Sequence, residues 1–530
     1  MSEMIAMVAG GCLLTVLLLF FVLLVLPKLR HRNFPGPHYY SFILGNTLDF
    51  VGRPGQGMVV LEEYRDRYGK TFQIWMLSRR CVVITDPEDI KHILATKALP
   101  KPERFNAGLA PLTRDGLVTT TEERHKAQRR AISGRFNEDF LRSLHKHSAA
   151  ALGDFSAILG DAAEKGAVID LDEMLTRLTL DVILRCAFGA EVGKIQSADA
   201  SNKHPLPLAI TVSLEECYRN LILYPLRAFH VAKPLRKATQ FIHEFCLELV
   251  NERRANPKSG DGDDDDDDLL DILMSIPGAT DDYIVGEVVT FLIAGHDTVN
   301  LTFLLLMAAI LVFIAICFYL LVLIYQTSHT LSFMFYELCK QPEIKEKMLA
   351  ELDTKMTDAH QTIPAFKDIA AVSYIRAVWK ETLRLHPAAA TGTMRIATED
   401  IYLPASKLTV EKGTELLVPP FVVGHSEDLW PEAHSFKPER FLNPTARPHP
   451  YAFQTFSAGH RNCIGQFFAT HEAVTIIMST LRQFDIELAC RPEEVTQFHA
   501  TIMRPRVPNY AGRGKDGPPM GLPVRVKKRL

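Results

Sequence analysis

Residues 456–465 read Phe-Ser-Ala-Gly-His-Arg-Asn-Cys-Ile-Gly. A cysteine stays a thiolate only where neighbouring donors or positive charge stabilise it. Gly459 permits a tight turn, and a helix predicted to begin near Gly465 would direct backbone N–H groups and the positive end of its dipole at the sulfur of Cys463. Gly465 also lets a flat ring lie against the backbone. A buried, inert cysteine is the alternative, but it leaves the surrounding glycines and arginine unexplained.

A thiolate in this setting is a ligand for haem iron and can push electron density toward cleavage of an O–O bond. The segment resembles the cysteine-ligand loop of the cytochromes P-450, and the resemblance extends over residues 33 to 510. It implies that Cys463 is the axial ligand of haem b, with Phe456 and Gly465 beside the cofactor. It also implies that Arg461 is a cation for a haem propionate.

Two downstream segments agree with this resemblance. Glu381 and Arg384 match the family's E-x-x-R helix motif, whose side chains form an ion pair at positions i and i+3. Arg440 lies in a Pro-Glu-Arg-Phe segment whose arginine joins that pair in the family. Taken alone, the first two residues would more often form a solvated surface pair. With Arg440 downstream we expect a buried triad that supports the haem loop and is structural, not catalytic.

Residues 294–298, Ala-Gly-His-Asp-Thr, resemble the oxygen-activation stretch of the family's long central helix. The chemistry needs a hydroxyl and a carboxylate that organise a water chain and deliver protons to dioxygen. Thr298 and Asp297 fit these two roles, and a functionless helix-interior pair is the alternative. Members of the lipid-hydroxylating branch often carry a glutamate in place of Ala294 that esterifies the haem, so the alanine implies noncovalent haem.

Two further cations are implied for the propionates. His125 and Arg129 resemble the family's W-x-x-x-R helix, with histidine where tryptophan is commoner. The imidazole N–H can still donate a hydrogen bond. Arg395, which follows the Glu381 helix, resembles the arginine of the strand region that faces the haem. Surface salt bridges are the alternative for each.

Composition excludes several other classes. The formal net charge of −3 gives no electrostatic case for a nucleic-acid partner. The nine cysteines show no paired spacing, which argues against a disulfide framework and against a structural zinc site. A cytosolic catalytic domain with reduced thiols fits best.

The N-terminus predicts a membrane anchor. Residues 4–26 are apolar and uncharged, and at about 1.5 Å per residue they can cross a hydrocarbon core of about 30 Å. Basic residues follow only on the C-terminal side, which places the rest of the chain in the cytosol. A cleaved signal peptide is the alternative, but the run is long and no small-residue cleavage site follows. We therefore expect a single-pass anchor at 1–32 in the endoplasmic reticulum and a catalytic domain at 33–530.

The periodicity predicts a mainly α fold with a small β portion. Residues 72–75 and 81–84 are strand-like, and residues 86–94 form a helix capped by Asp86. Further helices are expected between about 120 and 255, from Leu269 to Gly295, and from Gly465. The six aspartates at 263–268 predict a hydrated loop, since like charges repel. A calcium site is the alternative, without a discernible ligand spacing.

Residues 299–326 interrupt this pattern with an apolar stretch that has no charged side chain. A single membrane crossing there is excluded, because it would separate Cys463 from Arg129, which must meet at one haem. The codons of Val299-Asn300 and Tyr325-Gln326 are compatible with intron ends, and most residues between have T in the second codon position. Our hypothesis is a translated retained intron whose removal joins Thr298 to Thr327. A lipid-facing hairpin is the rival.

The resemblance implies a monooxygenase that inserts one atom of dioxygen into an apolar substrate such as a fatty acid, a sterol, another lipid or a xenobiotic. Electrons would come from NADPH through a separate NADPH–cytochrome P-450 reductase, the redox partner that the resemblance implies. Membrane lipid is the other expected partner. The fatty-acid and lipid hydroxylase branch is the most similar. The alternatives are a haem-thiolate isomerase or dehydratase that does not use dioxygen, and a non-enzymatic multi-span membrane protein.

Overall fold

The computed structural model describes most of the chain: residue 18 and residues 21–38, 44–53, 55–76, 79–134, 137–192, 195–196, 204–223, 233–257, 268–295, 327–358, 360–443, 448–499, 503–510 and 520–529. Most of the apolar run at 4–26, the predicted catalytic residues Asp297 and Thr298, and the stretch 299–326 lie outside these ranges. Within them, no helix combines the length and the apolar character needed to cross a membrane.

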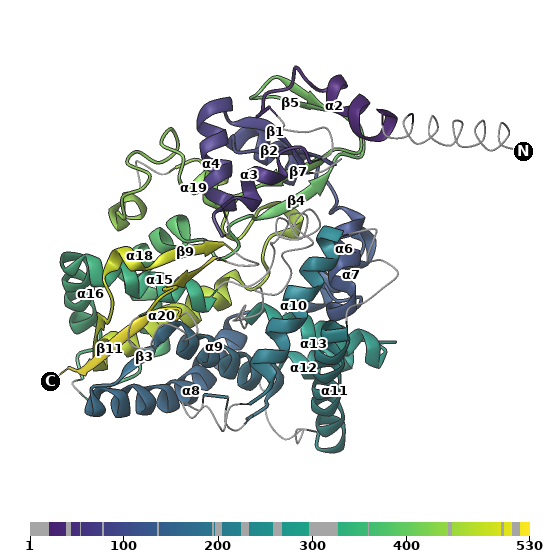
Figure 1. Ribbon diagram of the computed structural model, residues 1–530. Helices are drawn as coiled ribbons and strands as arrows, with labels where there is room; N and C mark the ends of the chain where they lie inside the picture. The colour runs from purple at the N-terminus through teal and green to yellow at the C-terminus, as the bar shows by residue number, and fades with distance from the viewer. Residues whose placement is uncertain are drawn as a thin grey trace, which may run out of the picture.

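A four-stranded sheet joins two distant parts of the chain. Its order is β1 (Thr71–Met76), β2 (Arg79–Ile84), β7 (Glu415–Val418) and β4 (Thr393–Ile396), with only the β2–β7 pair parallel. Both faces are buried. One packs on α4 (Gly57–Tyr68) and α19 (Pro420–Gly424), the other on α5 (Pro87–Lys91) and the π-helical turn η2 (His92–Thr96). Figure 1 shows this sheet at one end of the molecule.

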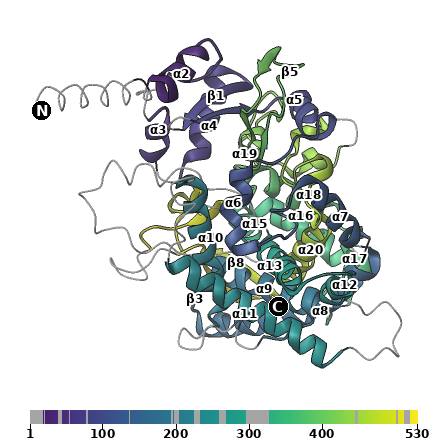
Figure 2. The ribbon, with the colours of Figure 1, turned by 90° about the vertical axis from the view of Figure 1, so that its right-hand side faces the viewer.

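Helices form the rest of the core. At the centre lies α9 (Leu171–Phe188), whose side chains are nearly all buried, the charged Asp172, Arg177 and Asp181 among them. Packed against it are α8 (Glu138–Lys165), α12 (Leu269–Ser275), α13 (Asp281–Gly295) and α15 (Thr327–Lys340). Figure 2 shows this helical layer below the sheet. The fold is therefore mainly α with a small β portion, as predicted.

The remaining elements surround this frame. The helices are α2 (Leu26–Arg30), α3 (Thr47–Val51), α6 (Glu103–Thr113), α7 (Glu122–Ser133), α10 (Leu206–Leu223), α11 (Lys233–Ala255), α16 (Pro342–Lys355), α17 (Phe366–Ala371), α18 (Ser373–Leu385) and α20 (Gln466–Gln483). The strands are β3 (Val168–Asp170), β5 (Ile401–Leu403), β6 (Leu408–Val410), β8 (Phe484–Leu488), β9 (Thr496–His499), β10 (Met503–Arg506) and β11 (Pro523–Lys528). Three short 3₁₀ turns, η5 (Pro438–Phe441), η6 (Pro450–Ala452) and η7 (Gly459–Arg461), lie near the cysteine loop.

Several local predictions are confirmed. Strands β1 and β2 form at the two predicted positions, and Asp86 caps α5 by accepting the N–H of Glu88 at 2.9 Å. The prediction of one helix from Leu269 to Gly295 is wrong. The chain breaks after α12 at Pro277 and Gly278, because proline lacks the amide and the glycine takes a φ of +75°.

The predicted hydrated loop at 263–268 also needs correction at its last residue. Asp268 is 6% exposed and caps α12, accepting N–H groups of Leu270 and Asp271. It also pairs with Arg253 at 2.7 Å. Charge repulsion is offset at this position because a guanidinium from α11 reaches it. The other five aspartates lie outside the described residues.

Candidate active site

The loop before α20 holds Cys463 in a defined turn. The amide of Cys463 donates to the carbonyl of Phe456 at 2.9 Å, which closes the loop, and α20 begins directly after Gly465. Gly459 has a φ of +74°, and a Cβ there would overlap the carbonyl oxygen of Leu94 in η2. The tight turn predicted at Gly459 is therefore present, and it presses the loop against η2.

Two groups stabilise negative charge on the sulfur of Cys463. Burial is the largest influence and raises the pKa of the thiol, whereas the N–H of Gly465 and the charge of Arg129 lower that pKa. The net pKa is raised. The Gly465 amide and Arg129 therefore act in the direction that favours a thiolate, and a coordinated metal cation would act in the same direction.

Gly465 leaves room for a flat group beside the sulfur. A Cβ added there would meet only the sulfur of Cys463, at 4.0 Å, among the described atoms within contact distance. The missing side chain thus creates an open face where a macrocycle can lie against the backbone, which fits a haem.

A cluster of cations lies near this loop. The side chain of Arg461 is 3% exposed, Arg395 on β4 is 2% exposed and His125 on α7 is 3% exposed. Burial and then the charge of Arg461 lower the pKa of Arg395 to about 10. Burial, followed by Arg461, Lys101 and Arg129, lowers the pKa of His125 to about 3, so the imidazole is neutral near pH 7. The buried positive charges of this cluster are not fully balanced by buried negative charges.

Unused donors mark the same cluster as an anion site. Nη1 of Arg461, Nε of Arg395 and Nδ1 of His125 are buried without a hydrogen-bond partner in the described part of the chain. Unpartnered buried polar atoms are costly, so such atoms point to a ligand. The propionates of a haem are anions of the right charge for these donors.

The sequence analysis did not identify two further charged residues of this cluster, Lys101 and Glu122. Lys101 donates to the carbonyl of Val118 at 2.9 Å, and burial lowers its pKa well below the usual value, with Arg395 and Arg461 adding repulsion. Glu122 pairs with Arg461 at 2.9 Å. Burial alone would raise the pKa of Glu122, but hydrogen bonds from His460 and Arg461 lower it. At the first turn of α7, Glu122 resembles an ordinary partner of the helix dipole, so no sequence signal pointed to it.

Arg129 lies beside the cysteine loop and contacts one of its residues. Its guanidinium donates to the backbone carbonyl of Asn462 at 2.7 Å and to the side-chain oxygen of the same residue at 2.6 Å. This bidentate contact fixes the residue next to Cys463. Arg129 therefore holds the cysteine loop in place through Asn462.

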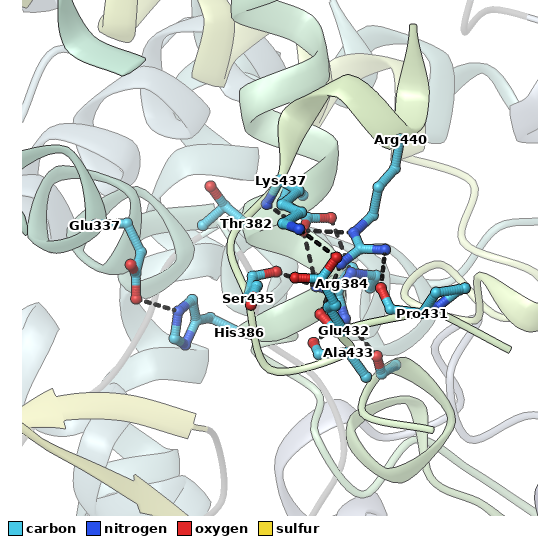
Figure 3. A network of polar contacts seen from close by, with 12 residues as sticks. Glu337, Thr382, Arg384, His386, Pro431, Glu432, Ala433, Ser435, Lys437 and Arg440 are labelled. Atoms are coloured by element: carbon cyan, nitrogen blue, oxygen red, sulfur yellow. Dashed lines mark hydrogen bonds and ion pairs between the residues drawn. The ribbon is translucent and has the colours of Figure 1, made fainter. Parts of the chain in front are cut away.

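A buried ion-pair network lies behind the loop (Figure 3). Arg384 donates to both carboxylate oxygens of Glu381 at 2.8 Å, and Arg440 donates to the same carboxylate at 3.2 Å. Further donors of Arg384 reach three backbone carbonyls, those of Gly424, Ala433 and Ser435. The structure thus brings the three predicted residues together, with Glu381 and Arg384 almost fully buried.

A buried hydroxyl connects this network to the cysteine loop. The side chain of Thr455, directly before Phe456, donates to the carbonyl of Leu383 at 2.9 Å in the buried interior. Since Leu383 precedes Arg384 on α18, displacement of that helix would move the start of the loop. A surface cavity of about 530 Å³, lined by residues of α9 and α11, contains none of these residues.

Comparison with known proteins agrees with this site. A family model described as Cytochrome P450 matches residues 35–311 and 326–511. The chain is 26% identical over 481 residues to cytochrome P450 4d2 of Drosophila melanogaster, covering 85% of this chain and 88% of the relative. It is 26% identical over 478 residues to cytochrome P450 4F2 of Homo sapiens, covering 86% of each.

Among solved structures, a cytochrome P450 designated CYP102L1 shares the fold with a TM-score of 0.73 at 22% identity, covering 94% of this chain and 99% of that one. The family binds haem b through a cysteine thiolate and incorporates oxygen from dioxygen, with electrons from a redox partner and an apolar substrate. Because the family model matches most of the chain, the chain belongs to the cytochrome P450 family.

Proposed function

We propose that the protein is a lipid hydroxylase that inserts one oxygen atom into a fatty acid or a related lipid. The observation that carries the proposal is the loop of Cys463, with a donor N–H at the sulfur and an open face over Gly465. The relatives from the 4d and 4F groups of cytochromes P450 support the lipid branch, in which the sequence motifs also place the chain. Electrons come from NADPH through a separate NADPH–cytochrome P-450 reductase.

Named residues hold the haem in this proposal. Cys463 would supply the thiolate that holds the haem iron, with Phe456 and Gly465 beside the ring. The propionates would be held by Arg461, Arg129, Arg395 and His125, as the resemblance implies, and also by Lys101, which lies near Arg395 and Arg461. Arg129 keeps the loop in place through Asn462. When bound, the haem activates dioxygen, and the protein supplies orientation, exclusion of water and protons. Ala294 has no carboxyl group, so the haem is held noncovalently.

Proton delivery is assigned to two residues outside the described ranges. Thr298 and Asp297 continue the sequence of α13, and their hydroxyl and carboxyl groups suit a relay. Replacing Thr298 with alanine should leave haem binding intact but uncouple NADPH oxidation from product, with peroxide released. Unchanged coupling would remove Thr298 from the mechanism and would favour an isomerase or dehydratase that needs no dioxygen.

We also propose that residues 1–32 anchor the protein in the endoplasmic reticulum membrane, where lipid substrate is available. The segment that follows the apolar run is held on the sheet. Lys28 lies over the ring of Trp75 at 5.1 Å, and the side-chain amide of Gln73 donates to the carbonyl of His31 at 2.8 Å. Such contacts would set the orientation of the catalytic domain relative to the anchor.

The stretch 299–326 is proposed to be a retained intron inside the catalytic domain at 33–530. The two blocks matched by the family model leave residues 312–325 unmatched, within this stretch. Directly after it, Ser328 and Thr330 are buried, and His329 bonds Asp172 of α9 at 2.7 Å. Both α13 and α15 pack on α9, as the two halves of one helix would.

The assignment of the iron ligand can be tested with two serine variants. Cys463→Ser should abolish the long-wavelength absorption band of the reduced carbon-monoxide complex, because serine is a poorer donor to iron. Cys490→Ser is the matched control, since Cys490 is also a free, half-buried thiol but lies outside the loop. If the band persists in Cys463→Ser, the ligand is a different residue.

A further inference from the structure

A carboxyl group on the first turn of α7 holds the turn η7 that leads to Cys463. Oε1 of Glu122 accepts from Nη2 of Arg461 at 2.9 Å and from Nε of the same residue at 3.2 Å. Oε2 lies 2.8 Å from Nε2 of His460. One side chain therefore binds two consecutive residues of η7, and the proposed function gives this carboxyl group no role.

The bonds from Glu122 leave Arg461 with one unused nitrogen. The side chain of Arg461 is 3% exposed, and its Nη2 also donates to the carbonyl of Thr120 at 3.2 Å. Nη1 is buried and has no hydrogen-bond partner among the described residues. Because the guanidinium is a planar, rigid fork, a carboxylate bound along the Nε–Nη2 edge directs Nη1 to the opposite side. Glu122 thus sets the orientation of the unused donor.

The contact with His460 extends this effect to a second donor. The ring of His460 lies 6.2 Å from the ring of His125 in an edge-to-face arrangement. Nδ1 of His125 is buried and is also without a partner in the part of the chain that the structure describes. By holding His460, Glu122 fixes the surface against which this imidazole packs.

Glu122 also influences the charge of the cation cluster. Burial opposes its ionisation, but hydrogen bonds from His460 and Arg461 lower the pKa of Glu122 below its ordinary value, so the group is a carboxylate near pH 7. Burial lowers the pKa of both Lys101 and Arg395, and the charge of Glu122 opposes that effect at each of them. The same carboxylate therefore favours the charged form of these cations.

We infer that Glu122 is a positioning residue of the haem site, which orients the unused donor of Arg461 and sets the positive charge offered to the propionates. This inference rests on the proposed function, in which Arg461 and His125 hold the propionates. Glu122 acts through Arg461 and His460 and is not itself a ligand of the haem. The opposite case is that Glu122 competes with a propionate for Arg461, and the sign of the effect on haem retention distinguishes the two.

Three substitutions in the full-length holoenzyme separate the reach of the side chain from its charge. Glu122→Gln keeps an oxygen that can accept from Arg461, and its amide can donate to the other tautomer of His460, but the charge is lost. Glu122→Asp keeps the charge and is one methylene too short to bind both residues. Glu122→Ala removes reach and charge together. Glu123→Gln is the matched control, because Glu123 is an exposed acid in the same turn of α7.

Haem retention measures the orientation of Arg461. Transfer of haem to excess apomyoglobin should be about tenfold faster in Glu122→Asp and Glu122→Ala than in the wild type, the equivalent of about 1.4 kcal/mol. Glu122→Gln and Glu123→Gln should stay within about twofold of the wild type, since a neutral acceptor still holds the guanidinium. If Glu122→Ala fails to fold, Glu122→Gln and Glu122→Asp decide the question.

The reduction potential of the haem measures the charge of the cluster. Loss of one negative charge beside the cations favours the ferrous haem, which carries one more electron than the ferric form. The midpoint potential of Glu122→Gln and Glu122→Ala should rise by about 30 mV, which is about threefold in the equilibrium constant of reduction at about 59 mV per tenfold. Glu122→Asp should keep the wild-type potential, and so should Glu123→Gln, whose lost charge is screened by solvent. A purely structural role of Glu122 would not produce this pattern in a spectroelectrochemical titration.

Three results would overturn the inference. Slower haem transfer in Glu122→Asp than in the wild type would show that Glu122 competes with a propionate for Arg461. Equal shifts of potential in Glu122→Gln and Glu122→Asp would indicate damage to the loop, and wild-type values of both quantities in every variant would show that Glu122 has no effect on the site. Failure of the proposed function is distinguishable, because the wild-type protein would then give no thiolate band or no lipid product, and neither measurement on the haem uses a lipid substrate.

Discussion

Replacement of Arg384 with methionine removes one member of a fully buried charge pair. Glu381 is 0% exposed and Arg384 is 2% exposed, so no water replaces the guanidinium. Breaking a buried pair by removing one partner costs about 3–5 kcal/mol. Three backbone carbonyls also lose their donor, and each unsatisfied carbonyl costs about 1 kcal/mol or more. Because these effects overlap, we expect a total loss of about 5 kcal/mol, close to the whole stability of a marginal domain.

The matched control is Arg440→Met. The side chain of Arg440 is 13% exposed, and its one hydrogen bond to Glu381 spans 3.2 Å. Glu381 would keep both bonds from Arg384 in this variant, so we expect a loss of about 1–2 kcal/mol. Urea unfolding followed by far-ultraviolet circular dichroism measures both variants, and haem absorbance reports whether the cysteine loop survives.

The ordering of the two variants is the test of the reasoning. Arg384→Met should unfold at a much lower urea concentration than Arg440→Met and should lose haem first, since α18 holds Thr455 through Leu383. Equal unfolding free energies within 1 kcal/mol of wild type would refute the claim that burial makes this pair essential.

Three further predictions concern the loop, the pH response and the chain itself. Gly459→Ala places a side chain against the Leu94 carbonyl at a φ of +74°, so we expect a loss of about 1–3 kcal/mol and weaker haem retention, and unchanged haem titration would contradict this. Burial raises the pKa of Glu287 from 4.5 to about 7, so the folded state holds the proton more tightly than the unfolded chain. The contribution of Glu287 to the free energy of unfolding is therefore fully present below the pKa that this group has in the unfolded chain. It falls by about 3 kcal/mol as the pH rises through the pKa that the group has in the folded state. The free energy of unfolding from urea titrations, measured at several pH values, should fall with rising pH in the wild type relative to Glu287→Gln. The same pH dependence in both proteins would contradict this prediction. A chain lacking 299–326 should bind haem stoichiometrically while the 530-residue form binds less. Codons 299–326 in the dominant spliced message would overturn the intron hypothesis.

Some errors of the sequence analysis have a shared physical origin. The break after Ser275 was missed because the apolar positions on both sides of Pro277 follow one helical pattern. Asp268 was assigned to a hydrated run because its partner, Arg253, lies on another helix. The bidentate contact of Arg129 with Asn462, which the sequence did not predict, depends on how α7 packs on the loop. For Asp268 and Arg129 a contact with a distant segment decides the local outcome, whereas the break at Pro277 and Gly278 is local.

The sequence by itself predicted the turn of the Cys463 loop and the Glu381–Arg384 pair, and both are present in the structure. Each lies within a few consecutive residues, so turn geometry and helical spacing already relate the side chains to one another. Tertiary structure alone decided which groups complete the site. Glu122 reaches Arg461 across 339 positions of the chain, Lys101 reaches Val118 across a helix, and Glu287 reaches Leu117 across 170 positions. Such partners are chosen by the packing of α7 and α13 against the loops, and no local pattern of residues encodes that packing.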